Sequence, residues 1–230
     1  MQETHLQIDP LNSNHPIPWN WVLATQSEVN PIQGPKMRYY RSQSLISPDG
    51  QYAAYSRIQM QVHSDMFSSW VSSVLFLENL RTGDLQAVTA SSPLADNPFS
   101  SDSTVEKPGT IAILVPISWS AEGDYLLARE FESLFGSSLA SDYATIWNRR
   151  LNRTSTVAPN RRQYTNAILM GWSKTFPGRV LFKAGNMGEE HWPLLAVDAS
   201  GHTVNASEDR PLTFGQTTTH IWAGPQAIAS

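Results

Sequence analysis

Short apolar runs separated by turn residues dominate the chain, and three stretches repeat one pattern of apolar and polar positions. Each has an apolar residue before a serine, then a turn that ends in glycine, then a short apolar run. The three stretches are residues 44–56, 118–130 and 171–183. This repetition indicates a β-hairpin unit that recurs along the chain, and it predicts an all-β fold.

Each copy extends into four expected strands. In the first copy, the turns come from Pro48-Asp49-Gly50 and from Thr82-Gly83-Asp84, residue types that suit tight reversals. No long helix is expected. The expected strands cover residues 39–46, 52–60, 71–80 and 85–89, then 110–119, 125–131, 143–150 and 155–158, then 167–172, 180–184, 194–197 and 202–204.

The two ends of the chain are expected to complete the fold. Residues 1–18 are polar and rich in proline, so they predict an extended N-terminal arm, whereas residues 19–25 suit a strand. Residues 220–229 resemble the opening strand of a further unit. Because three units would leave two open sheet edges, pairing of these two end strands would protect both edges.

The predicted architecture is therefore a small β-propeller-like meander of about four four-stranded units, with the N- and C-termini sharing the last unit. It forms a single domain over residues 19–230, with units at about 39–90, 110–159 and 167–215 and closure by residues 19–25 and 220–229. Two alternatives stay open: a curved sandwich of two sheets, and an incomplete propeller that a partner chain completes.

Four segments carry a resemblance to a known repeat: residues 47–50 (Ser-Pro-Asp-Gly), 75–83, 196–201 and 212–213 (Leu-Thr). They resemble the repeat of TolB-like, WD40-like β-propellers, and the repeats are also similar to those of cyanobacterial proteins. The resemblance covers about residues 39–215. The second and third turns depart from it, and the turns lie further apart than the about 40–45 residues of a blade. It implies a propeller and no particular activity, because this architecture hosts many functions.

Composition excludes several classes of function. The 230 residues include no cysteine, which excludes disulfides, thiol catalysis and zinc sites that use cysteine. A net charge of −4 disfavours nucleic acid and anionic membranes as partners. The longest apolar run, residues 111–117, is far shorter than the about 20 residues of a membrane helix. With no secretory signal at the N-terminus, these features predict a soluble cytoplasmic protein without a membrane span.

Catalytic motifs are absent from the sequence. It has no nucleophile elbow, no zinc-protease His-Glu-x-x-His, no phosphate loop and no dinucleotide fingerprint. We therefore expect a non-enzymatic interaction or scaffold module that binds a protein partner, with no cofactor and no metal. An arginine-rich run over residues 149–162 suits either a solvated hairpin or an acidic protein surface.

The loops between the second and third strands of each unit carry the candidate binding residues. In a propeller these loops lie on one face, where aromatic and methionine side chains could anchor a partner. In the alternative interpretation the same side chains fold back into the core. A second candidate region is the Ser- and Pro-rich connection at residues 90–109. The candidate partner-binding residues are Met66, Phe67, Trp70, Leu134, Phe135, Glu189, Glu190, His191 and Trp192.

Two other functions use the same loops. A hydrolase could use His63, Asp65, Glu190 and His191, provided that they come within hydrogen-bond reach of one another or of a shared water. A small-ligand or sugar-binding protein could instead stack Trp70 and Trp192 on ligand rings.

Overall fold

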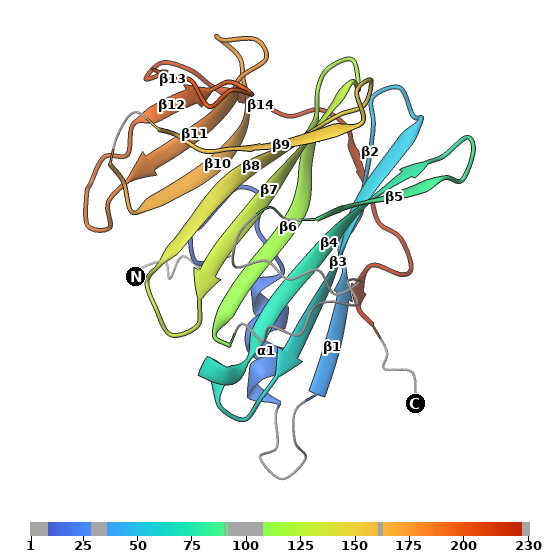
Figure 1. Ribbon diagram of the computed structural model, residues 1–230, viewed down its shortest axis with the longest axis vertical. Coiled ribbons are helices and arrows are strands. Elements are labelled where there is room, and N and C mark those ends of the chain that lie inside the picture. Colours follow the sequence, from blue (N-terminus) through green and yellow to red (C-terminus); the bar gives the residue numbers. More distant parts are fainter. Residues whose placement is uncertain (1–8, 29–35, 90, 92–107, 161–162, 227–230) are drawn as a thin grey trace, which may run out of the picture.

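A computed structural model describes residues 9–28, 36–89, 91, 108–160 and 163–226, and most of these residues are β-strand (Figure 1). The described residues form sixteen strands, of which eleven lie in one sheet and five in another. The all-β prediction is confirmed. The strand order in both sheets is that of an open sheet, from β15 to β9 and from β13 to β14.

Among the described residues, the helical elements are one α-helix and a short 3-10 turn between β3 and β4. They are α1 (Trp19–Ser27) and η2 (Met66–Ser68). The strands are β1 (Lys36–Arg41), β2 (Ser44–Ile46), β3 (Tyr52–Val62), β4 (Trp70–Asn79), β5 (Leu85–Thr89), β6 (Thr110–Trp119), β7 (Tyr125–Leu134), β8 (Ala140–Asn148), β9 (Arg153–Val157), β10 (Asn166–Ser173), β11 (Val180–Gly185), β12 (Leu194–Val197), β13 (Thr203–Asn205), β14 (Pro211–Leu212), β15 (Gln216–Thr218) and β16 (Gly224–Pro225).

The three repeated stretches all form antiparallel hairpins, namely β2–β3, β6–β7 and β10–β11. The turns also share one detail, because a serine hydroxyl at or just after the end of the first strand accepts a hydrogen bond from the backbone N–H of a residue further along the hairpin. The pairs are Tyr52 N to Ser47 Oγ (2.9 Å), Tyr125 N to Ser120 Oγ (3.1 Å) and Phe176 N to Ser173 Oγ (2.8 Å). The expected hairpin strands are confirmed to within a few residues.

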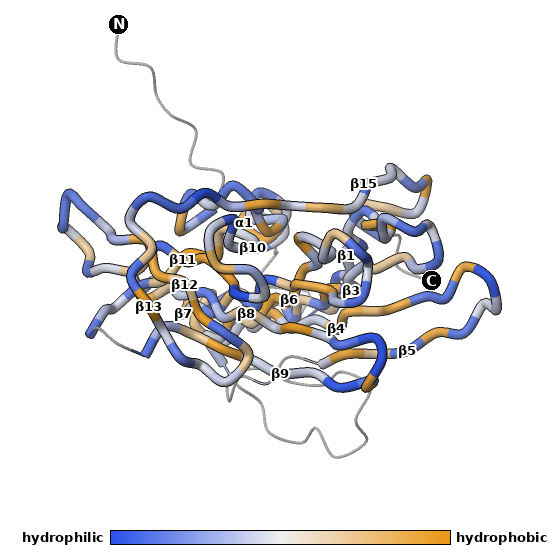
Figure 2. Tube along the Cα trace, turned by 90° about the horizontal axis from the view of Figure 1, so that it is seen from above, coloured by the Kyte–Doolittle hydropathy of each residue, from blue (hydrophilic) through white to orange (hydrophobic). Residues whose placement is uncertain are grey.

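The three hairpins contribute side chains to one shared core. Strands β4 and β6 meet in a parallel pair at Val71 and Ile111, which joins the first two strand sets in one sheet. The largest cluster of buried side chains includes Ile58, Phe131 and Phe182, one from each repeated hairpin. Figure 2 shows hydrophobic segments along the middle strands and hydrophilic residues at the outer turns.

One C-terminal segment pairs with the first strand of each repeated hairpin, β2, β6 and β10, at the same position of the repeat. Strand β14 pairs Leu212 with Trp172, Phe214 bridges to Trp119, and β15 pairs Gln216 with Ile46. Each partner is the residue that precedes the turn serine. Two indoles extend the connection, because Trp172 Nε1 donates to the Trp119 carbonyl (2.8 Å) and Trp119 Nε1 to the Leu45 carbonyl (3.1 Å). We call residues 211–218 the closing segment.

The strand prediction for residues 19–25 is wrong, because these residues belong to α1. The alternating Trp-Asn-Trp-Val pattern suits a strand, but tertiary packing decides between the two conformations. In the helix, the buried residues Val22 and Thr25 lie three positions apart on one face. Trp21 packs against Tyr40 of β1, with ring centroids 5.3 Å apart and the ring planes tilted by 46°.

The described part of the predicted N-terminal arm is packed rather than extended. Asp9, Leu11 and Ile17 are buried, and Asp9 Oδ1 accepts hydrogen bonds from the backbone N–H groups of Leu11 and Ser13. The C-terminal residues pair with β1 through β16 rather than with residues 19–25. The chain ends therefore meet the first strand set, but through different elements from those expected. Residues 1–8 and 227–229, and most of the 90–109 connection, lie outside the described residues.

Candidate functional site

Backbone hydrogen bonds join two of the three candidate loops. The side chain of Asp65 caps η2, since its Oδ1 accepts from the Phe67 N–H (3.1 Å) and its Oδ2 from the Ser68 hydroxyl (3.1 Å). Gly109 then bridges the loops, because its N–H donates to the Ser69 carbonyl and its carbonyl accepts from the Phe135 N–H, both at 2.8 Å. The β3–β4 loop and the β7–β8 turn therefore form one continuous surface.

Phe67 is the exposed aromatic at this junction. Its side chain is 59% exposed, yet its ring lies directly against Gly136 of the β7–β8 turn. A Cβ atom at Gly136 would lie 2.5 Å from the ring, so a larger residue at this position would displace the ring from its present place. Leu139 ends the same turn and is also exposed. We call Phe67, Leu134, Gly136 and Leu139 the Phe67 surface.

Other candidates on these two loops fold back, as the alternative interpretation describes. Phe135 is buried in the core, and Met66 packs against the same core cluster. Trp70 is half-buried, and its ring lies 5.6 Å from the His63 ring. Phe67 is therefore the candidate whose aromatic ring is most available to a partner.

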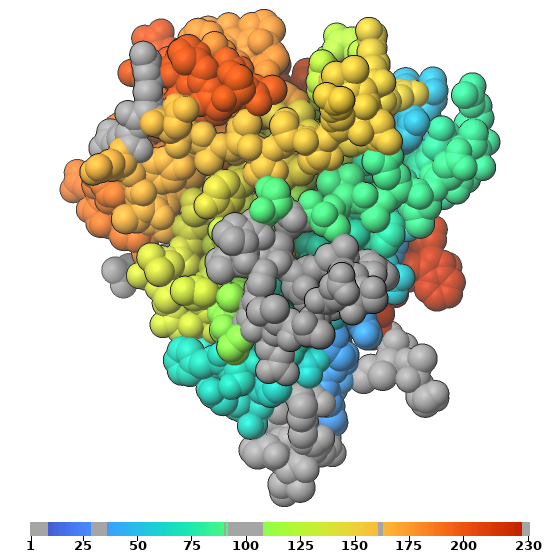
Figure 3. All heavy atoms as spheres, viewed as in Figure 1, coloured from blue at the N-terminus to red at the C-terminus, as the bar shows by residue number. Residues whose placement is uncertain are grey.

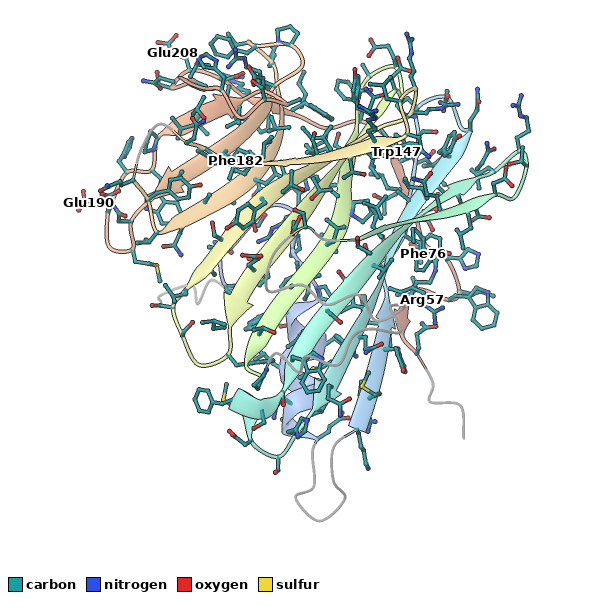
Figure 4. All side chains as sticks on the ribbon, in the orientation of Figure 1. Arg57, Phe76, Trp147, Phe182, Glu190 and Glu208 are labelled. Carbon is teal, nitrogen blue, oxygen red and sulfur yellow. The ribbon has the colours of Figure 1, made fainter. Side chains whose placement is uncertain are left out.

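The third loop belongs to the five-stranded sheet and lines a cavity of its own. The Trp192 ring covers Gly185, and its Nε1 donates to the Asn186 carbonyl at 3.2 Å. Glu189 accepts hydrogen bonds from Asn186, and Figure 4 shows Glu190 projecting outward on this loop. The cavity measures about 680 Å³, and its lining includes Leu11, Lys183, Glu189, Glu190, His191 and Trp192.

The four residues of the hydrolase hypothesis fall into two separate groups. Asp65 caps η2 and the His63 ring packs beside Trp70, whereas Glu190 and His191 line the cavity on the other sheet. Within the part of the chain that the structure describes, no hydrogen bond connects the two groups, and no cluster of three His, Asp or Glu side chains could hold a metal ion. The geometry therefore does not favour a shared His/carboxylate centre.

A fully buried charged cluster surrounds Arg129 of β7, and no pattern in the sequence predicts it. The Arg129 Nε donates to Asp142 Oδ1 of β8 (2.7 Å), and its Nη1 donates to Asp9 and to the His15 carbonyl (2.8 Å). Asp142 Oδ2 accepts from the Leu169 N–H of β10 at 2.9 Å. Burial raises the pKa of Asp142 to about 6, despite the opposing attraction of Arg129. The cluster ties the N-terminal segment to both sheets.

A pair of glutamates on β7 is a second unforeseen feature. Burial, and then the neighbouring charge of Glu130, raises the pKa of Glu132 to about 7, while a hydrogen bond with Tyr143 opposes the shift. Glu130 is buried and accepts a 2.7 Å hydrogen bond from Thr145. Glu132 Oε1 is buried without a hydrogen-bond partner in the described structure. Ionised Glu132 is therefore unfavourable in the folded state.

Glu132→Gln should stabilise the protein at about pH 8, by about 1–2 kcal/mol after allowance for partial solvent screening. The pKa of Glu132 is higher in the folded chain than in the unfolded chain. Its favourable contribution is therefore complete only at low pH and disappears as the pH rises through about 7. The advantage of glutamine should thus shrink towards pH 5, as urea unfolding at both pH values would measure. Glu122→Gln, an exposed turn carboxylate, is the control, and an equal gain for Glu132→Gln at both pH values would contradict the prediction.

Comparisons with known proteins do not assign the chain to a family: no family model and no curated protein matches it. Among the described residues, no helix has the length and apolar character needed to cross a bilayer. The arginine-rich run is partly engaged in ion pairs, Arg149 with Asp49 and Arg150 with Asp124, while Arg161 and Arg162 lie outside the described residues.

Proposed function

We propose that this protein is a non-enzymatic cytoplasmic interaction module that binds a protein partner through the Phe67 surface. The observation that carries the proposal is a largely exposed aromatic ring that is attached to a capped backbone and packs against a neighbouring loop. The Asp65 cap holds its backbone, and Gly136 supports its ring. Aromatic anchors with little conformational freedom to lose are the residues that contribute most to protein interfaces. The expected partner therefore presents an apolar pocket that accepts a phenyl ring.

A TolB-like or WD40-like propeller relationship is also part of the proposal. Three hairpins that each carry a serine at the end of the first strand, and whose first strands meet on one closing segment, support a radial arrangement about a common centre. Such scaffolds commonly serve recognition, and their loops can evolve independently of their core. The closing segment would then replace the fourth unit that the sequence predicted from the two ends of the chain.

Small-ligand binding at the cavity beside Trp192 is supported less well than protein binding. The cavity has both apolar and charged residues, as ligand sites do. The Trp192 indole, however, already has a structural role, because its ring packs on Gly185 and its N–H is bonded to Asn186. We therefore base the proposal on Phe67.

Photo-crosslinking tests the proposal at a single residue. A benzophenone amino acid would replace Phe67, and the matched control would carry it in place of Leu151, an exposed residue of the β8–β9 turn. We expect discrete adducts in native lysate from position 67 and none of these from position 151. Phe67→Ser should then weaken binding of the purified partner about tenfold or more. Identical adducts at both positions, or unchanged affinity of Phe67→Ser, would refute the function.

A further inference from the structure

The edge of the large sheet beside the C-terminal segment carries cations and no carboxylates. Strands β1, β2, β3, β15 and β16 contain one lysine and three arginines but no aspartate or glutamate, although the chain as a whole has a net charge of −4. The three arginines are Arg38, Arg41 and Arg57, and none of them takes part in an ion pair within the described residues. This concentration of positive charge is unusual for an acidic protein.

Two of these arginines lie directly opposite each other. The β1–β3 register pairs Arg41 with Arg57, and like charges at opposed positions destabilise a sheet. The Arg41 guanidinium lies 3.8 Å from the centre of the Tyr55 ring and donates to the Ser42 carbonyl and the Ser44 hydroxyl. Arg57 is exposed. An arrangement that is unfavourable for folding points to a functional reason for its presence.

An apolar turn projects next to these cations. Ile221 is 88% exposed and Trp222 is 62% exposed, in the connection between β15 and β16. The turn is held by hydrogen bonds, because Gln226 donates from its side chain to the Trp222 carbonyl and from its backbone to the Tyr39 carbonyl, both at 2.8 Å. Figure 3 shows this C-terminal segment protruding from the surface.

Strand pairing places the turn and the cations side by side. Gly224, two residues after Trp222, pairs with Arg41, and Arg41 in turn pairs with Arg57. Figure 4 shows Arg57 on the side of the sheet that lies next to the C-terminal segment. We call Arg41, Tyr55, Arg57, Ile221 and Trp222 the basic edge.

We propose that the basic edge is a binding site for an acidic protein segment that also carries apolar residues. Arginine guanidinium groups bind carboxylates through two parallel hydrogen bonds, and Ile221 and Trp222 offer apolar contact alongside. Nucleic acid fits less well, because the net negative charge of the chain repels a long polyanion and the basic edge offers a base only one exposed ring, that of Trp222. A second binding surface is what a scaffold requires, and it does not depend on the Phe67 surface.

Fluorescence anisotropy with a synthetic peptide tests this site directly. The probe is a labelled peptide of alternating acidic residues and leucine or phenylalanine, and its control replaces each acid by the matching amide. We expect the acidic peptide to bind about tenfold more tightly than the amide peptide, with an affinity that falls as salt rises from about 50 to about 200 mM. Equal binding of the two peptides, or no binding of the acidic peptide, would overturn the proposal.

Variants locate the binding and separate it from general charge effects. Arg57→Glu should weaken binding of the acidic peptide about tenfold. Trp222→Ala should weaken it several-fold, because Trp222 supplies an apolar contact beside the arginines. Arg153→Glu makes the same charge change at an exposed position on β9, and its effect should stay below about twofold. Thermal unfolding would verify that each variant is folded. Equal effects of Arg57→Glu and Arg153→Glu, or stronger binding of single-stranded oligothymidylate than of the peptide, would refute the site.

Discussion

Replacing Arg129 by methionine should lower the free energy of unfolding by about 3–5 kcal/mol at pH 7. The guanidinium lies between two fully buried carboxylates, those of Asp9 and Asp142. Methionine fills much of the volume but leaves both negative charges without a cation in a site from which water is excluded. Urea unfolding of wild type and variant would measure the loss, with the slope of the transition showing whether unfolding stays cooperative.

Arg149→Met is the matched control for this prediction. Arg149 also pairs with an aspartate, Asp49, but both side chains are partly exposed to solvent. A pair of this kind contributes about 1 kcal/mol or less, because water screens it and solvates the remaining charge. If the two arginine variants lose the same free energy of unfolding, then burial is not the reason why the Arg129 ion pairs stabilise the protein.

The pH dependence of the Arg129 variant gives an independent check. Burial already raises the pKa of Asp142 to about 6 with the guanidinium present, and removal of the cation should raise that pKa further. Asp142 of the variant then binds a proton more tightly in the folded chain than in the unfolded chain. The loss of stability caused by Arg129→Met should therefore be largest at high pH and should shrink as the pH falls. Asp142→Asn in the Arg129→Met background should recover part of the stability, since it removes one uncompensated charge.

The hairpins could be predicted from sequence because their determinants are local. Serine, glycine and the flanking apolar residues of each turn lie within a few positions of one another, as Ser120 and Gly123 do, and the same hydrogen bonds recur in the structure. The strand prediction for residues 19–25 failed because tertiary packing, rather than the local sequence, decides their conformation and which of their side chains are buried. Burial of Val22 against the sheet is a tertiary effect that its neighbours do not encode.

The site features depended on contacts between distant segments. Arg129 bonds to Asp9 across 120 positions, and no spacing rule relates two such residues. The position of the exposed Phe67 ring depends on Gly136, a residue of another loop. Phe135, next to Gly136 in the sequence, is buried. Aromatic content therefore identified the loops, but which ring is exposed was decided by tertiary packing.

Gly215→Ala should destabilise the protein by about 2–5 kcal/mol, because two separate effects add at this position of the closing segment. Its φ of +99° is a conformation that side-chain-bearing residues rarely adopt. A methyl group there would also lie 2.7 Å from the Ile46 carbonyl oxygen and 2.8 Å from the Trp119 ring. Relief of that contact would pull β15 away from β2 and Phe214 away from Trp119.

Gly178→Ala separates the two effects at Gly215. Gly178 has a positive φ of +78° in the third hairpin turn, but nothing lies within 4 Å of the position that an alanine methyl group would take. Its substitution should therefore cost only the backbone strain of about 1–2 kcal/mol. Urea unfolding of the two variants measures the difference, and hydrogen exchange at the Trp119 amide, which donates to the Phe214 carbonyl, shows whether the closing segment detaches. Equal losses for the two glycine variants would mean that the closing segment does not hold the three first strands together.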